Sequence, residues 1–188
     1  DLDDADKVLT LVDLNHPFVL AQDGLTPSES NPQFHQQMVY AVAMRTIRRF
    51  EQALGRLVLW APRFEERTRE KAATETYVQR LRIYPHAIRE ANAYYSPNKV
   101  ALLFGYFPAP VLAGHVGATR VNIFTCLSHD IIVHEATHAL LDGMHRRFGE
   151  PSNPDVLAFH EAFADIVALF QHFSLPGVLR HQIANVAF

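Results

Sequence analysis

Hydrophobic residues recur at helical spacing between positions 32 and 54. They fall three or four positions apart, on what would be one helical face, and are Val39, Ala43, Ile47, Phe50 and Leu54. Asn31 and Pro32 supply an N-cap and a proline at the first helical position, and Gly55 is a typical residue after a helix end. The pattern predicts an amphipathic helix over this segment.

The pattern changes between positions 57 and 126, where short apolar runs are separated by polar residues. The runs are 57–60, 81–84, 93–95, 100–107 and 121–126. They are typical of a small mixed sheet, largely antiparallel, interrupted by one charged helical segment at 64–73. Ser96-Pro97-Asn98 has turn chemistry, which predicts a hairpin whose outer strand is an exposed edge.

Two more helices follow. Ser128 is an N-cap, Asp130 suits the positive end of the helix dipole, and the helix is expected to end near Gly143 with Ile132, Ala136, Ala139 and Leu140 toward the core. The second begins at Asn153-Pro154, carries Phe159, Phe163, Val167 and Phe170 on one stripe, and stops at Pro176-Gly177. We therefore predict an α+β chain with an N-terminal α/β lobe over 1–127 and a helical segment over 128–188.

Composition narrows the possible functions. The 188 residues are 48% hydrophobic, enough for a substantial core, and a net charge of -3 with no long basic run argues against a nucleic-acid surface. No apolar run approaches the roughly 20 residues of a membrane span, and the acidic start is not a signal peptide. We expect a soluble chain without a membrane partner. Its single cysteine, Cys126, excludes an internal disulfide.

The segment His134-Glu135-Ala136-Thr137-His138 carries the strongest chemical signal. Histidines at i and i+4 lie on one helical face, so both imidazoles can bind a single zinc ion. Glu135 points about 100° around the helix from His134, which suits a general base acting on a water molecule beside the metal. Catalytic zinc usually has three protein ligands and one open position. The segment therefore predicts a further ligand downstream.

Glu161 is the candidate for that third zinc ligand. It lies on the second of the two helices, and Asp165 follows at i+4 on the same face. A carboxylate in that position can accept a hydrogen bond from the distal ring nitrogen of a ligating histidine and fix its tautomer. We assign that role to Asp165, with His134 as its partner.

His134 to His138 followed by Glu161 and Asp165 resembles the gluzincin class of metallopeptidases, and thermolysin-like enzymes in particular. The likeness extends to Asp130, Thr137 and Asp142, and Asn92-Ala93-Tyr94-Tyr95 resembles that family's edge strand. The resemblance implies a zincin-like fold and a zinc-dependent endopeptidase that adds its peptide or protein substrate to the edge strand. It also implies substrate contacts at Asn92, Ala93 and Ile131, with Ile131 beside an apolar pocket.

The chain also departs from the thermolysin-like pattern. The acidic calcium cluster after the edge strand is replaced by Phe104-Gly105-Tyr106-Phe107, and Gly149 stands where an oxyanion-stabilising tyrosine is expected. The histidine partner of that tyrosine would come from a C-terminal helical domain, leaving His145 and His160 as substitutes. A second hypothesis is therefore a zinc-binding gluzincin-fold protein that binds peptides or partners with weak or no turnover. An aminopeptidase is less favoured, because no Gly-x-Met-Glu-Asn stretch occurs.

Overall fold

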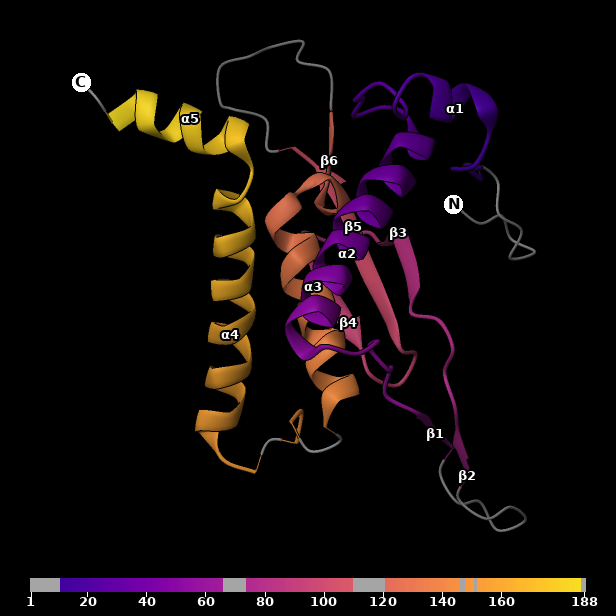
Figure 1. Ribbon diagram of the computed structural model, residues 1–188. Coiled ribbons are helices and arrows are strands. Elements are labelled where there is room, and N and C mark those ends of the chain that lie inside the picture. Colours follow the sequence, from indigo (N-terminus) through magenta and orange to yellow (C-terminus); the bar gives the residue numbers. More distant parts are fainter. Residues whose placement is uncertain (1–10, 66–73, 110–120, 146–147, 151, 187–188) are drawn as a thin grey trace.

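The computed structural model describes residues 11–65, 74–109, 121–145, 148–150 and 152–186. These residues form a mixed α+β fold with a small open sheet (Figure 1). Two long helices, α2 (Pro32–Leu54) and α3 (His129–Met144), contact each other and the sheet, and α4 (Pro154–Phe173) packs on α3. Two short helices complete the described part, α1 (Pro17–Ala21) and α5 (Pro176–Val186).

Helix α2 forms as its sequence predicts. The Asn31 side chain accepts a hydrogen bond from the backbone N–H of Gln33, and Gly55 has a left-handed φ of 67° that favours glycine. Val39 and Ala43 are fully or almost fully buried and Ile47 is buried with them. This apolar face positions α2 against α3.

The sheet is built around β5 (Ala101–Pro108). It pairs in parallel with β3 (Arg82–Ile88) and antiparallel with β4 (Ala93–Ser96) and β6 (Asn122–Phe124), so β4 lies at an edge of the strand order β3-β5-β4. Because β5 lies inside the core, its first residues form a continuous buried apolar run. The predicted hairpin and its edge strand are confirmed by the β4–β5 pair.

One local prediction before the sheet is wrong, and a second is wrong at the two positions that the structure describes. The apolar run at 57–60 forms no strand, and the predicted helix at 64–73 begins instead inside β1 (Arg63–Glu65), which pairs antiparallel with β2 (Thr74–Thr76). Positions 66–73 lie outside the described residues. The mixed and largely antiparallel character of the sheets is as predicted, with β3–β5 as the parallel exception.

A 3-10 turn at Thr125–Leu127 leads directly into α3. The Ser128 side chain accepts from the backbone N–H of Ile131, as expected of an N-cap. Ile132, Val133, Ala136 and Ala139 are fully buried. Helix α3 is thus a central core helix, and its polar positions face α4 and β4.

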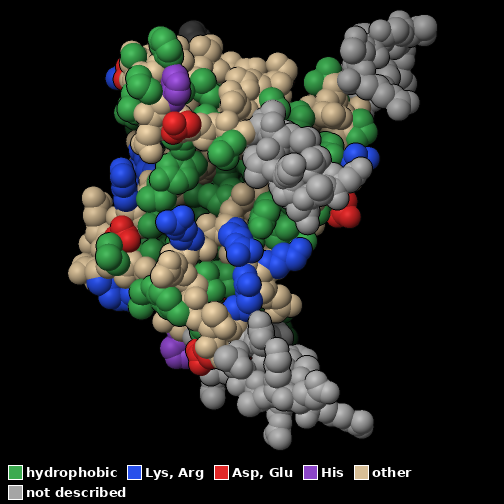
Figure 2. Space-filling model, turned by 90° about the vertical axis from the view of Figure 1, so that its right-hand side faces the viewer, with side chains coloured by type: hydrophobic (Ala, Val, Ile, Leu, Met, Phe, Trp, Pro, Cys, Tyr) green, Lys and Arg blue, Asp and Glu red, His purple; other side chains and the backbone are tan. Residues whose placement is uncertain are grey.

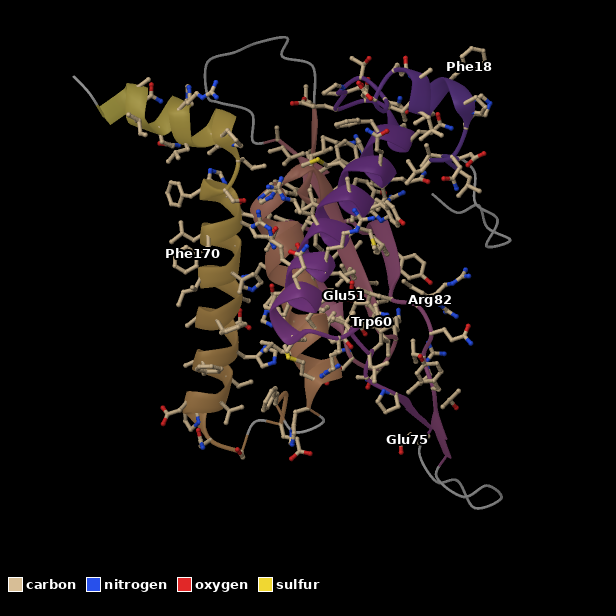
Figure 3. All side chains as sticks on the ribbon, viewed as in Figure 1. Phe18, Glu51, Trp60, Glu75, Arg82 and Phe170 are labelled. Atoms are coloured by element: carbon tan, nitrogen blue, oxygen red, sulfur yellow. The ribbon has the colours of Figure 1, made fainter. Side chains whose placement is uncertain are left out.

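Helix α4 begins at the Asn153 cap, as predicted, and Val167 of its predicted stripe packs against the core, but the two ends of the stripe are exposed. Its buried positions are Ala164, Ala168 and Gln171, while Phe159 and Phe170 are 65% and 69% exposed. Figure 3 shows Phe170 pointing away from α3. Small residues allow the two helix backbones to approach closely, which leaves the large side chains on the outer face.

The length and composition of α4 also meet the criteria for a membrane span, with a mean hydropathy of 1.2, although only 17% of the tested window is buried. One such helix is weak evidence, and α4 carries Glu161 and Asp165. A soluble protein is compatible with this finding.

The division into a lobe over 1–127 and a segment over 128–188 stays a prediction. Helices α2 and α3 lie on either side of that boundary, and they contact each other.

Candidate metal site

His134 and His138 lie one turn apart on α3, and their rings meet edge to face with centroids 4.6 Å apart. Their Nε2 atoms are separated by 2.9 Å. The flanking positions Val133, Ala136 and Thr137 are buried, which fixes the rotation of the helix and leaves both imidazoles on the side of α4.

Glu161 on α4 completes a group of three potential metal ligands. Its Oε2 atom lies 3.1 Å from His134 Nε2 and 3.6 Å from His138 Nε2, and the three donor atoms all lie within 4.8 Å of one another. Two donors that each lie ~2.0–2.1 Å from a tetrahedral zinc ion are about 3.4 Å apart. The observed separations therefore need adjustments of only a few tenths of an ångström to hold a metal ion.

Asp165 makes the contact expected of it, with its Oδ1 atom 2.8 Å from His134 Nδ1. The carboxylate accepts the Nδ1 hydrogen, so the Nε2 atom of His134 presents a lone pair to Glu161 and His138. Three acceptor atoms at these distances repel one another unless a cation or a proton lies among them. The donor set fits a metal ion, and two imidazoles with one carboxylate suit zinc.

His160 is a site residue that the sequence analysis treated only as a speculative substitute oxyanion donor. Its Nδ1 atom lies 2.7 Å from His138 Nδ1, and the two rings stack with centroids 4.9 Å apart. Burial lowers the pKa of His138 to about 4 and also lowers that of His160, so both rings are neutral near pH 7. His160 orients His138 as Asp165 orients His134, a pairing that depends on how α3 and α4 pack.

Glu135 is buried between α3 and the edge strand, with 8% of its surface exposed. Its Oε2 atom accepts a 2.8 Å hydrogen bond from the backbone N–H of Tyr95 on β4. Burial raises the pKa of this carboxyl to about 7, against the opposing effects of His134 and the Tyr95 N–H. A carboxyl with such a pKa can both accept and return a proton at neutral pH.

The edge strand β4 therefore contacts the motif on α3 directly. Tyr95 also donates its hydroxyl hydrogen to Asp142 Oδ2 at 2.8 Å, a second bond between β4 and α3. The backbone N–H of Ala93, two residues earlier, donates to the side chain of Asn92 at 2.9 Å. Alternate residues of a strand point the same way, so the Ala93 and Tyr95 N–H groups share the outer edge of β4.

The other residues that the sequence analysis singled out, as substrate contacts or oxyanion positions, differ in their exposure. Asn92 is exposed beside this edge, and Ile131 is partly buried against the core in the first turn of α3. His145 follows α3 and stacks on Phe148 at 4.9 Å, while Gly149 is exposed. The side chains of Glu161 and Asp165 are 64% and 74% exposed, so the site opens to solvent on the α4 side.

One cavity lies beside the site, and a second lies away from it. One of about 340 Å³ lies beside His160 and is mainly apolar, with Leu141, Phe148, Val156 and Phe159 in its wall. A larger cleft of about 990 Å³ lies on the β3 side, and none of the three potential ligands lines it.

Comparison of the chain with protein-family models, with curated proteins and with solved structures gives no match.

Proposed function

We propose that this chain is a zinc-dependent metallopeptidase of the gluzincin type, an endopeptidase rather than an aminopeptidase, with a zincin-like fold. The observation that carries the proposal is the convergence of His134 Nε2, His138 Nε2 and Glu161 Oε2 within 4.8 Å. The buried carboxyl of Glu135 lies on the next position of the same helix. Metal ligands and an adjacent base are the parts that hydrolysis of an amide requires.

Zinc would be bound by His134, His138 and Glu161, with Asp165 and His160 orienting the two imidazoles. When bound there, zinc acidifies water toward a pKa of ~7 and polarises a carbonyl group. These properties make amide hydrolysis feasible at neutral pH.

Glu135 carries the proton through the reaction. Its carboxylate takes a proton from the attacking water as the water oxygen bonds to the carbonyl carbon of the scissile amide. It then gives that proton to the amide nitrogen as the carbon–nitrogen bond breaks, which leaves a carboxylic acid and an amine. The proton of the acid then passes to the amine, so the products are a carboxylate and an ammonium group. The hydrogen bond from the Tyr95 N–H fixes one carboxylate oxygen and leaves Oε1 for the reacting water.

The substrate would bind along the outer edge of β4. An extended peptide can add to an exposed strand edge through backbone hydrogen bonds. At this edge the Ala93 N–H donates to the Asn92 side chain, and it would exchange that bond for one to the peptide. Asn92 and Ala93 are the proposed backbone contacts, and Ile131 the proposed contact to a side chain of the peptide.

A second candidate function is peptide or partner binding without turnover. It is favoured by one observation, the Gly149 position, which offers no hydroxyl to stabilise an oxyanion. Oxyanion donors contribute about 3 kcal/mol each to the transition state. The same fold and the same zinc ligands would serve a binding protein equally well.

Metal content and peptide cleavage, measured side by side, test the proposal. Wild type is expected to bind zinc and to cleave a quenched peptide library. Glu135→Gln should keep its zinc and lose activity by about 10²–10⁴-fold, because the base is gone, and Glu161→Ala should lose the zinc that His134 and His138 bind. Glu75→Gln on β2 is the matched control, since Glu75 is exposed and distant in sequence from the motif.

The outcomes separate the two functions. Cleavage that Glu135→Gln abolishes without loss of zinc supports the peptidase. Zinc binding with peptide affinity but no cleavage by wild type supports the binding protein, and absence of zinc from the folded wild type overturns both.

A further inference from the structure

A second group of potential metal ligands lies in the core, apart from the site above. It consists of His35 on α2, His86 on β3 and Cys126 in the 3-10 turn before α3. Their ligand atoms all lie within 4.8 Å of one another. His35 is 1% exposed, Cys126 is fully buried and His86 is partly buried.

The hydrogen bonds of His35 leave one ring nitrogen ready to bind a metal. Its Nε2 atom lies 3.0 Å from the backbone oxygen of Glu29, an acceptor, so Nε2 carries the hydrogen. The Nδ1 atom then presents a lone pair, and it lies 2.8 Å from His86 Nε2. A backbone carbonyl that fixes the tautomer in this way is the usual support of a ligating histidine.

Aromatic rings surround the two imidazoles. Phe124 packs on both, with centroids 4.6 Å from the His35 ring and 5.1 Å from the His86 ring, and Tyr106 stacks on Phe124. Such walls exclude water and strengthen the binding of a cation by nearby donors. Burial lowers the pKa of His35 and lowers that of His86 to about 4, which keeps both rings neutral, the form that binds metals.

We propose that His35, His86 and Cys126 form a second metal site, one that binds a divalent transition-metal ion of the zinc type. Two imidazole nitrogens and a thiolate exclude calcium and magnesium, which prefer oxygen, and suit zinc or cobalt(II). Nitrogen donors on a tetrahedral ion are about 3.4 Å apart, so the 2.8 Å pair must separate by about half an ångström. On binding, the Cys126 thiol releases its proton to solvent and the sulfur bonds to the metal.

The position of these three side chains indicates what a bound ion would do in the fold and how the ion could reach them from solvent. The ligands come from α2, β3 and the turn that enters α3, so the ion ties the sheet to both central helices. His86 also lines the cleft of about 990 Å³, which gives the site a route to solvent. Figure 2 shows the face on this side, where Lys and Arg side chains gather among hydrophobic ones.

Cobalt(II) is the probe that distinguishes the two sites. A thiolate bound to cobalt(II) gives a near-ultraviolet charge-transfer band, whereas a site of two histidines and a glutamate has no sulfur and gives none. The chain has one cysteine, so the band reports Cys126 alone. The expected result is the band in the full wild-type chain and in Glu161→Ala, and its loss in Cys126→Ala.

Two further variants make the outcome decisive. His86→Ala should weaken the band, and His172→Ala, which alters a histidine of another cluster, should leave it unchanged. Circular dichroism shows that each variant is folded. A folded wild type without the band, with the same cobalt uptake as Cys126→Ala, would show that the three side chains only pack in the core. That result would leave the peptidase proposal standing, because its ligands are separate.

Discussion

Asp165 and His160 hold the two histidines of α3 from opposite ends of a short stretch of α4. The Asp165 contact follows from the sequence, because Asp165 lies one turn beyond Glu161 and reaches the same histidine. The His160 contact does not, since residues adjacent in a helix point about 100° apart, and only the packing of α4 shows that both reach α3. Contacts that follow from residue spacing within one helix can be predicted from the sequence, whereas contacts that depend on how two helices pack cannot.

Asp165→Ala should weaken zinc binding by about 10–100-fold, the usual effect of removing the partner of a ligating histidine. His134 then loses the acceptor that fixes its tautomer. A zinc titration against a competing chelator measures the change. Asp155→Ala, on the first turn of the same helix, is the control and should bind zinc like wild type. Equal affinities for all three proteins would contradict the assigned role of Asp165.

Asp130 links the start of α3 to the end of α4, with its Oδ1 atom 3.0 Å from His129 and 2.8 Å from His172. Burial tends to raise the pKa of this carboxyl, but the hydrogen bonds and charges of the two histidines outweigh it and lower the pKa. Because the folded pKa lies below the unfolded one, the stabilisation is present above the unfolded pKa and is lost as pH falls through the folded pKa.

Asp130→Asn should therefore lower the melting temperature near pH 6, where the carboxylate is charged. The difference from wild type should shrink as pH falls below the folded pKa of Asp130, since both side chains are then neutral. Thermal unfolding followed across this pH range measures it. A difference that stays constant with pH would mean that the charge of Asp130 is irrelevant.

At the scale of elements, α4 is positioned by small side chains and by its C-terminal end. Ala164 and Ala168 are buried against α3, and Gln171 donates a buried 3.0 Å hydrogen bond to Thr46 on α2. The Ser174 hydroxyl oxygen accepts from Arg49 at 2.6 Å. These contacts fix where Glu161 and Asp165 meet the histidines.

Ala164→Leu should push α4 away from α3 and weaken zinc binding by about 10-fold or more, although no ligand is altered. Overpacking of this kind also costs about 1–3 kcal/mol of stability. Ala162→Leu is the matched control, because Ala162 is exposed on the same helix and should change neither quantity. Zinc affinity and the free energy of unfolding are measured together. Unchanged affinity in Ala164→Leu would mean that α4 is free to shift.

Gly143 allows the segment after α2 to approach the end of α3. A Cβ at this position would lie 2.0 Å from the backbone oxygen of Leu59, whereas one at Gly177 in α5 would meet no atom within 4 Å. In an open helical position, Gly→Ala stabilises by about 0.5–1 kcal/mol. Gly143→Ala should instead destabilise the fold, while Gly177→Ala should be neutral or stabilising, as chemical denaturation would show. Equal effects would contradict the close approach.

At the scale of the whole molecule, the sequence predicts local features better than long-range ones. The capped helices and the β4–β5 hairpin follow from residues that are neighbours in the chain, such as Asn31, Ser128 and Asn153. The parallel pairing of β3 with β5 joins strands separated by β4, so no local signal specifies it. The exposure of Phe159 and Phe170 at the two ends of the α4 stripe has a similar cause, since periodicity identifies a stripe but not which of its residues pack.

The two helices that carry the proposed zinc ligands are consecutive in the chain but depend on different supports. Helix α3 is enclosed by the core, whereas α4 is largely exposed and contacts it along one narrow face. A metal ion shared by both would act as a crosslink that closes a loop, and it would lower the probability that α4 opens locally. Glu161→Ala, which loses this ion and leaves the His35, His86 and Cys126 group unaltered, should therefore accelerate amide hydrogen exchange in α4 first, while β5 keeps its protection. If both elements lost protection equally, α4 would unfold only with the whole chain, and its attachment would owe nothing special to the metal.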